Sequence, residues 1–162
     1  MTLETLDALQ QRMGAHVAVQ GAALAVVERA RLVEVARFLR DDPALKLDFL
    51  TGLCAVDWPA DGNVELVYHL YSVALRHGPL TLKCRTQDRA ADCRVPSVTS
   101  VWRGAEYQER EAFDLYGVIF DGHPDLRRIL MWDGFMDFPM RKDYVPPDDN
   151  EWEPTPHAEG KR

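Results

Sequence analysis

Charged, aromatic and histidine residues that are candidates for a functional site gather between positions 109 and 144. This stretch reads EREAFDLYGVIFDGHPDLRRIL and then, after a spacer, PMRKDY. Charged, aromatic and turn-forming residues are denser here than a self-contained core needs. The stretch therefore has to be tested as a reactive site and as a surface that meets another molecule.

A metal site is the first chemistry that the stretch suggests. His123 stands near Asp114, Asp121 and Asp125, which together offer nitrogen and oxygen ligands. However, no second histidine or cysteine lies at ligand spacing, and a metal site needs several convergent ligands. The His123-Pro124 pair instead predicts a turn in which the imidazole bonds to backbone or to a carboxylate. A hydrolase that uses His123 with Asp121 or Asp125 remains an alternative of a different class.

Acid/base and thiol chemistry are also disfavoured. Glu109 and Glu111 are two positions apart, so on a helix they point about 200° away from each other, and we expect a solvated or interfacial face. Cys54, Cys84 and Cys93 form no CxxC pair and have no flanking histidine. They are too few for an iron–sulfur cluster, which needs about four thiolates. We expect reduced thiols without a disulfide, and the scattered glycines form no nucleotide-binding loop.

Basic residues fit an interface better. Arg127 and Arg128 follow the turn at His123, and Arg141 and Lys142 follow Pro139. Guanidinium groups pair well with carboxylates on a partner surface. Pairing within the chain, with Asp125, Asp137 and Asp143, is the open alternative. Aromatic residues alternate with these charges, which is typical of interface hot spots: Phe113, Tyr116, Phe120, Trp132, Phe135, Phe138 and Tyr144.

Hydrophobic spacing, caps and turn residues predict the helices and strands around this stretch. We expect helices over residues 2–14, 30–40 and 106–116, the last ending at Gly117. We expect strands over residues 17–19, 22–27, 49–56, 65–73 and 80–85. The last three strands should form an antiparallel meander, and strand 65–73 should be covered on both faces, by a helix and by a partner. The fold class is α+β: a two-layer domain over residues 1–144, with a mostly antiparallel sheet covered by helices.

We expect residues 145–162 to form an extended, acidic, proline-rich tail. They read VPPDDNEWEPTPHAEGKR and contain almost no apolar residue except Val145 and Trp152. Such a composition cannot form a core of its own. The tail is either a disordered terminus or an arm that becomes ordered against another subunit, with Trp152 as its anchor.

Composition limits the classes of function. The 162 residues are 46% hydrophobic, which suits one domain of ordinary size. The net charge of -7 argues against nucleic-acid binding, because phosphate neutralisation needs a basic surface. No apolar run approaches the roughly 20 residues that span a bilayer, and residues 1–14 do not form a signal-type apolar block. We therefore expect a soluble chain that is not exported.

The run EREAFDLYGVIFDGHPDLRRIL followed by PMRKDY resembles the signature of the 30 kDa subunit of respiratory complex I, the proton-translocating NADH:quinone oxidoreductase. A looser similarity extends upstream through ARFLRDDP and the meander strands. The resemblance implies residues that serve the fold and the contact with other subunits, and none that is catalytic. They are Glu111, Asp114, Tyr116, His123, Pro124, Arg127, Arg128, Arg141, Lys142, Asp143 and Tyr144.

The resemblance also implies a role and partners. Family members belong to the peripheral arm and pack against the 49 kDa subunit, which helps to form the quinone cavity. The iron–sulfur subunits are their neighbours. They bind no cofactor, since FMN and the iron–sulfur clusters reside in partner subunits. The implied function is a non-catalytic structural subunit that braces the quinone-site and iron–sulfur subunits. It would be peripheral, on the cytoplasmic side of a bacterial inner membrane, and would touch the membrane only through the complex.

Two features depart from the family pattern. Many members have glycine, histidine, proline and leucine before the arginine-lysine-aspartate triplet, where this chain has Asp137, Phe138, Pro139 and Met140. The tail also differs from many members and is similar to those of cyanobacterial and plastid relatives. The alternative is therefore the equivalent subunit of an energy-converting hydrogenase or of a ferredoxin-dependent quinone oxidoreductase.

Overall fold

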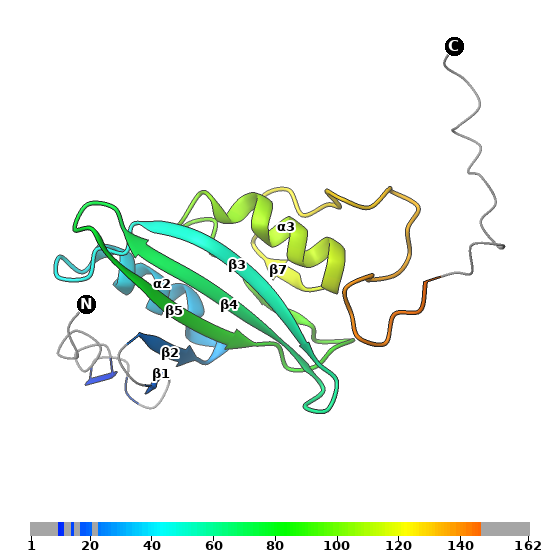
Figure 1. Cartoon of the computed structure of the whole chain (residues 1–162), viewed down its shortest axis with the longest axis horizontal. Coiled ribbons are helices and arrows are strands. Elements are labelled where there is room, and N and C mark those ends of the chain that lie inside the picture. The colour runs from blue at the N-terminus through cyan, green and yellow to red at the C-terminus, as the bar shows by residue number, and fades with distance from the viewer. Residues whose placement is uncertain (1–9, 12–13, 15–16, 21–22, 147–162) are drawn as a thin grey trace, which may run out of the picture.

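The computed structural model describes residues 10–11, 14, 17–20 and 23–146 (Figure 1). Its elements are, in chain order, β1 (Val17–Gln20), β2 (Leu24–Val27), a 3-10 turn η2 (Arg29–Arg31), α2 (Leu32–Asp41), β3 (Phe49–Trp58), β4 (Asn63–Ser72), β5 (His77–Arg85), β6 (Arg94–Pro96), α3 (Ala105–Tyr116) and β7 (Ile119–Asp121).

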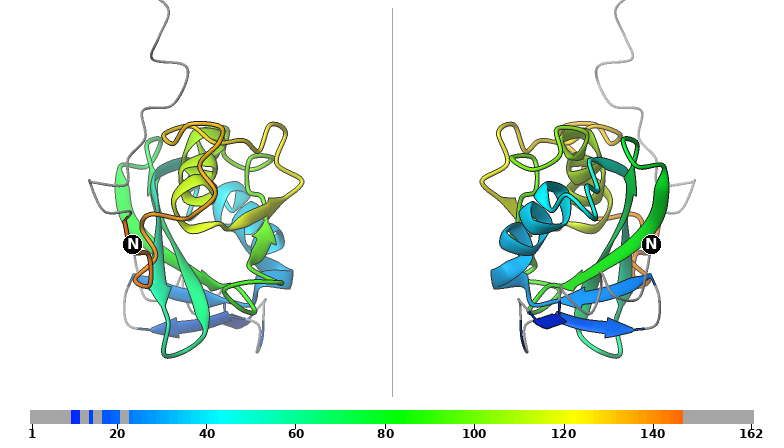
Figure 2. Two further views of the ribbon diagram at one scale, coloured as in Figure 1. Left: turned by 90° about the vertical axis from the view of Figure 1, so that its right-hand side faces the viewer. Right: turned by 90° about the vertical axis from the view of Figure 1, so that its left-hand side faces the viewer.

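Five strands form one sheet in the order β1-β2-β5-β4-β3, in which only the β2–β5 pair is parallel. Helices α2 and α3 lie on the same side of this sheet (Figure 2). On α2 the apolar residues recur at helical spacing, so Leu32, Val35, Ala36 and Leu39 share one buried face. The α+β class, the mostly antiparallel sheet and the antiparallel meander β3-β4-β5 are confirmed.

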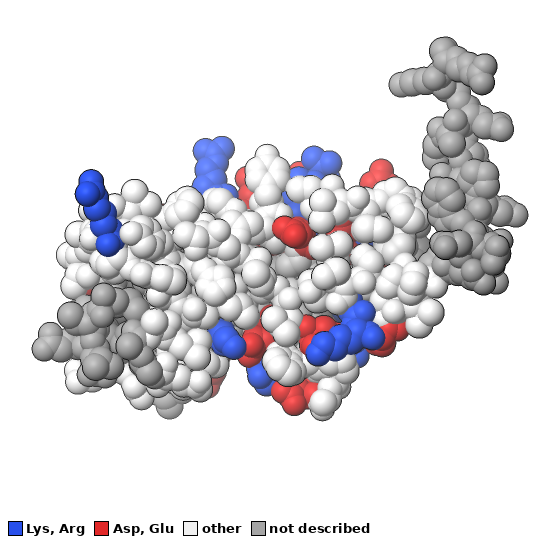
Figure 3. All heavy atoms as spheres, in the orientation of Figure 1, with Lys and Arg blue, Asp and Glu red and all other residues white. Residues whose placement is uncertain are grey.

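The core lies between the sheet and the helices. On β4, Leu66, Tyr68 and Leu70 are fully buried and point toward the helices. The alternate residues Val67 and His69 face the other way and are half-buried. Figure 3 views the side of the molecule on which this outer face lies. The helical cover of β4 is confirmed, and cover of its outer face by a partner stays a prediction.

A second, two-stranded sheet was not predicted. Strands β6 and β7 pair in parallel on either side of α3 in the sequence. The pairing continues beyond the strands, because Ile119 N–H donates to Cys93 C=O (2.9 Å) and Ser97 N–H donates to Asp121 C=O (2.8 Å). This pairing joins the segments that precede and follow α3, the helix in which the signature stretch begins.

The described chain continues after β7 without helix or strand, through residues 122–146. Trp152, most of the tail and most of the helix expected over residues 2–14 lie outside the described residues. Of the helices within the described part of the chain, none has the length and apolar character needed to cross a bilayer. All three cysteines are free thiols, with Cys84 and Cys93 buried and Cys54 exposed.

Candidate subunit interface

Asp114 lies in the second half of α3 and is completely buried. One carboxylate oxygen accepts hydrogen bonds from the backbone N–H groups of Ile129 (3.0 Å), Leu130 (2.7 Å) and Met131 (2.8 Å). Burial alone would raise the pKa of Asp114, but these three bonds and the Arg128 guanidinium outweigh it, so the pKa lies below its ordinary value. Asp114 therefore stays ionised and holds the chain that follows β7 against α3.

Arg128 completes this anchor. Its Nη1 donates to the Asp114 carboxylate (2.6 Å) and to the Asp114 backbone carbonyl (3.0 Å). Its Nη2 reaches the carbonyl of Asp137 (3.2 Å), and its guanidinium lies over the rings of Phe135 and Phe138. Arg110, buried on α3, donates to two further backbone carbonyls, those of residues 127 and 128. We call residues 128–144 the fastened loop.

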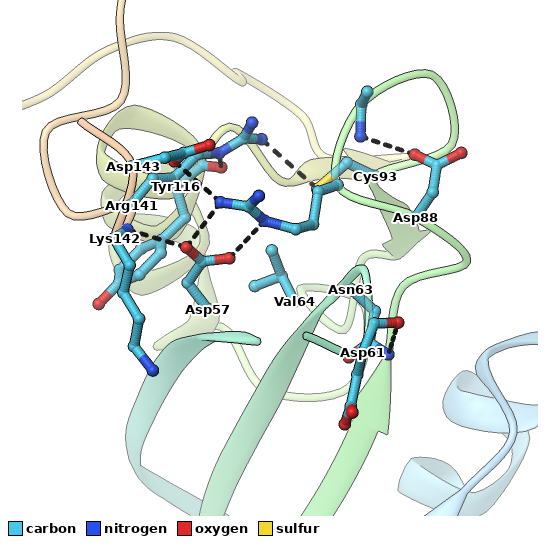
Figure 4. Close-up of polar contacts among 12 residues, drawn as sticks. Asp57, Asp61, Asn63, Val64, Asp88, Cys93, Tyr116, Arg141, Lys142 and Asp143 are labelled. Carbon is cyan, nitrogen blue, oxygen red and sulfur yellow. Dashed lines mark hydrogen bonds and ion pairs between the residues drawn. The ribbon is translucent and has the colours of Figure 1, made fainter. Parts of the chain in front are cut away.

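The end of the fastened loop is bound to the sheet. The buried carboxylate of Asp57 accepts two bonds from Arg89 (2.7 and 2.8 Å) and one from the backbone N–H of Lys142 (2.9 Å). Arg89 also pairs with Asp143 (2.9 Å). In Figure 4 the carboxylates of Asp57 and Asp143 lie on opposite sides of the guanidinium with which both pair. Arg141 Nε donates to the Tyr116 carbonyl (2.7 Å), so the last turn of α3 also binds the loop.

Aromatic contacts close the loop on itself. Arg141 stacks on Phe138, with 4.6 Å between the guanidinium carbon and the ring centroid. Tyr144 lies beside Phe135, at 6.1 Å between ring centroids, and its N–H donates to Arg141 C=O. For Arg128 and Asp143 the pairing is thus within the chain, although Arg128 pairs with Asp114 rather than with the acids considered from the sequence.

His123, Pro124 and Arg127 lie apart from Asp114, in the turn after β7. The N–H of Asp125 donates to His123 Nδ1 (3.0 Å), so the ring proton is on Nε2, which bonds to the Glu106 carbonyl (2.9 Å). The predicted turn with a backbone-bonded imidazole is confirmed, and both ring nitrogens are occupied. Arg127 pairs with Asp125 at the surface (2.8 Å), which contributes little to stability.

Glu109 and Glu111 point in different directions, as their spacing predicts. Glu111 is exposed, but Glu109 is fully buried, so the expected solvated or interfacial face was wrong for Glu109. The Glu109 carboxyl accepts bonds from Ser97 Oγ (2.6 Å) and from the Val98 N–H (2.8 Å). Burial raises the pKa of Glu109 to about 7. The Glu109 side chain points inward because residues 97 and 98 pack against α3 there. The local sequence around Glu109 does not indicate this contact.

The fastened loop exposes several large apolar side chains, beside the exposed Asp133 and Asp137. Leu130 is 61% exposed, Trp132 51% and Met136 85%, and Ile129 and Met140 are exposed as well. Trp132 and Phe135 meet edge to face, at 4.8 Å between ring centroids. A loop held this firmly on its inner side presents these side chains in a fixed arrangement. Exposed apolar groups on a rigid support are typical of interaction sites.

Sequence reasoning missed three residues that hold this site: Asp57, Arg89 and Arg110. Asp57 and Arg89 meet across 32 positions of sequence, so no local pattern indicates the pair. Nowhere in the part of the chain that the structure describes do three histidine, cysteine or acidic residues come together as metal ligands. The fold and these contacts define an α+β protein whose signature residues fasten a loop and leave its apolar side chains exposed.

The comparisons with known proteins identify the family. The sequence model of the family described as respiratory-chain NADH dehydrogenase, 30 Kd subunit, matches residues 25–150. This chain therefore belongs to that family, which confirms the resemblance found in residues 109–144.

Curated relatives are named as subunits of NADH-quinone oxidoreductases. The relative from Rhizobium etli is 52% identical over 115 residues, which is 70% of this chain and 59% of the relative. The relative from Roseiflexus castenholzii is 49% identical over 118 residues, which is 72% of this chain and 66% of the relative. The chain thus spans about three-fifths to two-thirds of these relatives.

Two solved structures share the fold. A chain of the membrane-bound sulfane sulfur reductase, an archaeal respiratory membrane complex, superimposes with a TM-score of 0.72 at 25% identity, covering 88% of this chain and 84% of that one. The trypsin-resistant fragment of Nqo5 superimposes with a TM-score of 0.57 at 28% identity, covering 78% of this chain and 100% of the fragment.

Proposed function

We propose that this chain is a non-catalytic structural subunit of the peripheral arm of a proton-translocating NADH:quinone oxidoreductase. It would brace the quinone-site and iron–sulfur subunits. The observation that carries the proposal is the fastened loop, in a chain that belongs to the 30 kDa subunit family. The Asp114 carboxylate accepts hydrogen bonds from Arg128 and from the Leu130 N–H and so holds its inner side, while Leu130, Trp132 and Met136 are exposed.

The partners in this proposal are a 49 kDa-type subunit and the neighbouring iron–sulfur subunits, which would carry FMN and the clusters between them. This chain would hold no cofactor and would contact the membrane only through the complex, on the cytoplasmic side of a bacterial inner membrane. The relatives named as subunits of NADH-quinone oxidoreductases support this placement.

The proposed role is geometric. Electron transfer and quinone reduction depend on fixed distances between subunits, and a site is held best by elements whose own positions are locked. Burying an exposed leucine, methionine or tryptophan side chain against a partner contributes roughly 1.5–3 kcal/mol each. The outer side of the fastened loop could therefore supply a large part of a docking energy.

The test is recovery of the complex. The chain is tagged and purified from solubilised membranes, with Leu130 and Trp132 replaced by alanine and the partner subunits quantified against wild type. We expect at least a tenfold loss of partner recovery, as a docking defect of about 1.4 kcal/mol or more would give. Val73→Ala is the matched control, because Val73 is also exposed (59%) but lies in the turn between β4 and β5. Unchanged recovery of the double variant would exclude the fastened loop as a docking surface.

A second candidate has its own observation. The chain of the archaeal sulfane sulfur reductase complex covers more of this chain, with a higher TM-score, than the Nqo5 fragment does. This match to a respiratory membrane complex named as a sulfane sulfur reductase supports an assignment outside the NADH:quinone oxidoreductases. The alternative that we propose is the equivalent subunit of an energy-converting hydrogenase or of a ferredoxin-dependent quinone oxidoreductase. The identity of the co-purified subunits distinguishes the two: an NADH-oxidising flavoprotein supports the first, and a hydrogenase-type or ferredoxin-binding subunit supports the second.

A further inference from the structure

A groove of about 170 Å³ lies between the edge of β3 and the last turns of α3, away from the exposed side chains of residues 129–136. Most of its lining is apolar: it consists of Leu53, Cys54, Ala55, Glu111, Ala112, Leu115, Tyr116 and Met140. Strand β3 is the last strand of the five-stranded sheet, so among the described strands only β4 pairs with it.

Backbone groups of β3 face this groove. The N–H of Leu53 donates to the side-chain oxygen of Gln108 on α3 (2.6 Å), so it points away from β4. In an antiparallel ladder the outward direction recurs at every second residue, which turns the N–H of Ala55 to the same side. The groove thus has a polar backbone wall beside its apolar side chains.

The rim of the groove is acidic. Glu111 is exposed and forms no ion pair or hydrogen bond with the described residues. The helix neighbours that could neutralise it, three and four positions away, are Tyr107, Gln108, Asp114 and Leu115, none of them basic.

Neither of two nearby polar groups neutralises the charge of Glu111. Tyr116 is half-buried at the groove, and its hydroxyl makes no hydrogen bond within the described residues. Burial raises the pKa of Tyr116, and the carboxylates of Asp57 and Glu111 raise it further, so the hydroxyl stays a neutral donor and acceptor. The ammonium of Lys142 lies over the Trp58 ring, 5.3 Å from its centroid, rather than on Glu111.

We propose that this groove receives a lysine or arginine side chain of a neighbouring subunit, with its aliphatic part between Leu115 and Met140 and its charged end at Glu111. Basic side chains bury their aliphatic stems along apolar surface while the charge stays at the rim, which matches a groove that is apolar inside and acidic at its edge. The proposal rests on the chain being a subunit of a larger complex. It adds a contact beyond the exposed side chains of residues 129–136, with Met140 as the one lining residue that belongs to the fastened loop.

The experiment uses the whole complex in membranes. A photoreactive diazirine amino acid close in size to methionine replaces Met140, which is 54% exposed, and the complex is irradiated, purified through the tagged chain and mapped by mass spectrometry. We expect cross-links to a partner-subunit peptide with a lysine or arginine at or next to the linked position. Glu111→Lys in the same background should lower the cross-link yield about tenfold, because it places like charges together.

Glu34→Lys is the matched control, because Glu34 is also an exposed helical carboxylate but lies on α2. It should leave the cross-link yield unchanged. Co-purified partners with cross-links only inside this chain would overturn the groove proposal and leave the proposed function standing. So would a linked partner peptide without a basic residue, or an unchanged yield in Glu111→Lys. If no partner subunit co-purifies at all, the proposed function fails, and the groove proposal fails with it.

Discussion

Glu109 and Asp114 are two carboxyl groups on one helix, both without solvent exposure, whose pKa values move in opposite directions. Burial opposes ionisation in both. Asp114 accepts bonds from three backbone amides and from the charged Arg128, which together favour the carboxylate. Glu109 receives only one hydroxyl and one amide bond, so burial dominates. The number and charge of the donors decides the direction of each shift.

The raised pKa of Glu109 predicts a pH dependence of stability. Between its ordinary value of 4.5 and about 7, the folded chain keeps a proton that the unfolded chain has released. The free energy of unfolding should therefore fall as pH rises through this range, by about 3 kcal/mol in total, and level off above it. Glu109→Gln should remove this decline, because an amide can still accept from Val98 N–H and donate to Ser97 Oγ.

Denaturant unfolding of the purified chain between pH 5 and pH 8 measures the effect. Glu111→Gln is the matched control, because this side chain is exposed on the same helix, and it should keep the wild-type profile. A Glu109→Gln variant with the same decline as wild type would assign the pH dependence to another group.

At the scale of elements, Gly117 joins α3 to the fastened loop. It ends the helix in the left-handed conformation, with φ of 74°, as the sequence predicts from its position. A Cβ atom built there would lie 2.6 Å from the ring of Phe138, on which Arg128 and Arg141 stack. The helix stop and the loop packing therefore depend on the same glycine.

Gly117→Ala should destabilise the chain by about 3 kcal/mol or more, from a left-handed backbone cost of roughly 1–2 kcal/mol plus the displaced ring. Gly122→Ala separates the two effects, since Gly122 also has a positive φ (83°) but nothing within 4 Å of the added Cβ. We expect only the backbone cost there. Equal losses in unfolding free energy for both variants would show that Phe138 yields freely.

Elements with their own periodicity or turn residues were predictable from the sequence. The face of α2, the stop of α3 and the meander β3-β4-β5 all have such local signals. Strands β6 and β7 have only three residues each and pair across 25 positions, as Arg94 and Ile119 show. The parallel β2–β5 contact is longer in range still, so neither pairing could be predicted from the local sequence.

At the scale of the whole molecule, Asp57 and Arg89 connect segments that are far apart in the chain. Asp57 is the last buried residue of β3, and Arg89 lies between β5 and β6. Lys142 and Asp143 lie at the end of the fastened loop. The sequence indicated the basic residues of the loop as candidates for a contact. Whether each one pairs with a partner subunit or within the chain depends on residues far away in the sequence, such as Asp57 and Arg89. The residues next to Asp57 in the sequence do not indicate this role.

The Asp57–Arg89 pair predicts a large and asymmetric loss of stability. The Asp57 side chain is 1% exposed and that of Arg89 19%, so Arg89→Leu leaves a buried carboxylate without its cation. We expect a loss of about 3–5 kcal/mol in the free energy of unfolding, with faster amide exchange at residues 141–144. Asp143→Asn breaks a pair with the same arginine, but Asp143 is 62% exposed, so it should cost less than about 1 kcal/mol. Denaturant unfolding and hydrogen exchange of the wild type and the two variants measure these losses. Equal effects of Arg89→Leu and Asp143→Asn would show that the buried Asp57–Arg89 pair does not hold the loop to the sheet.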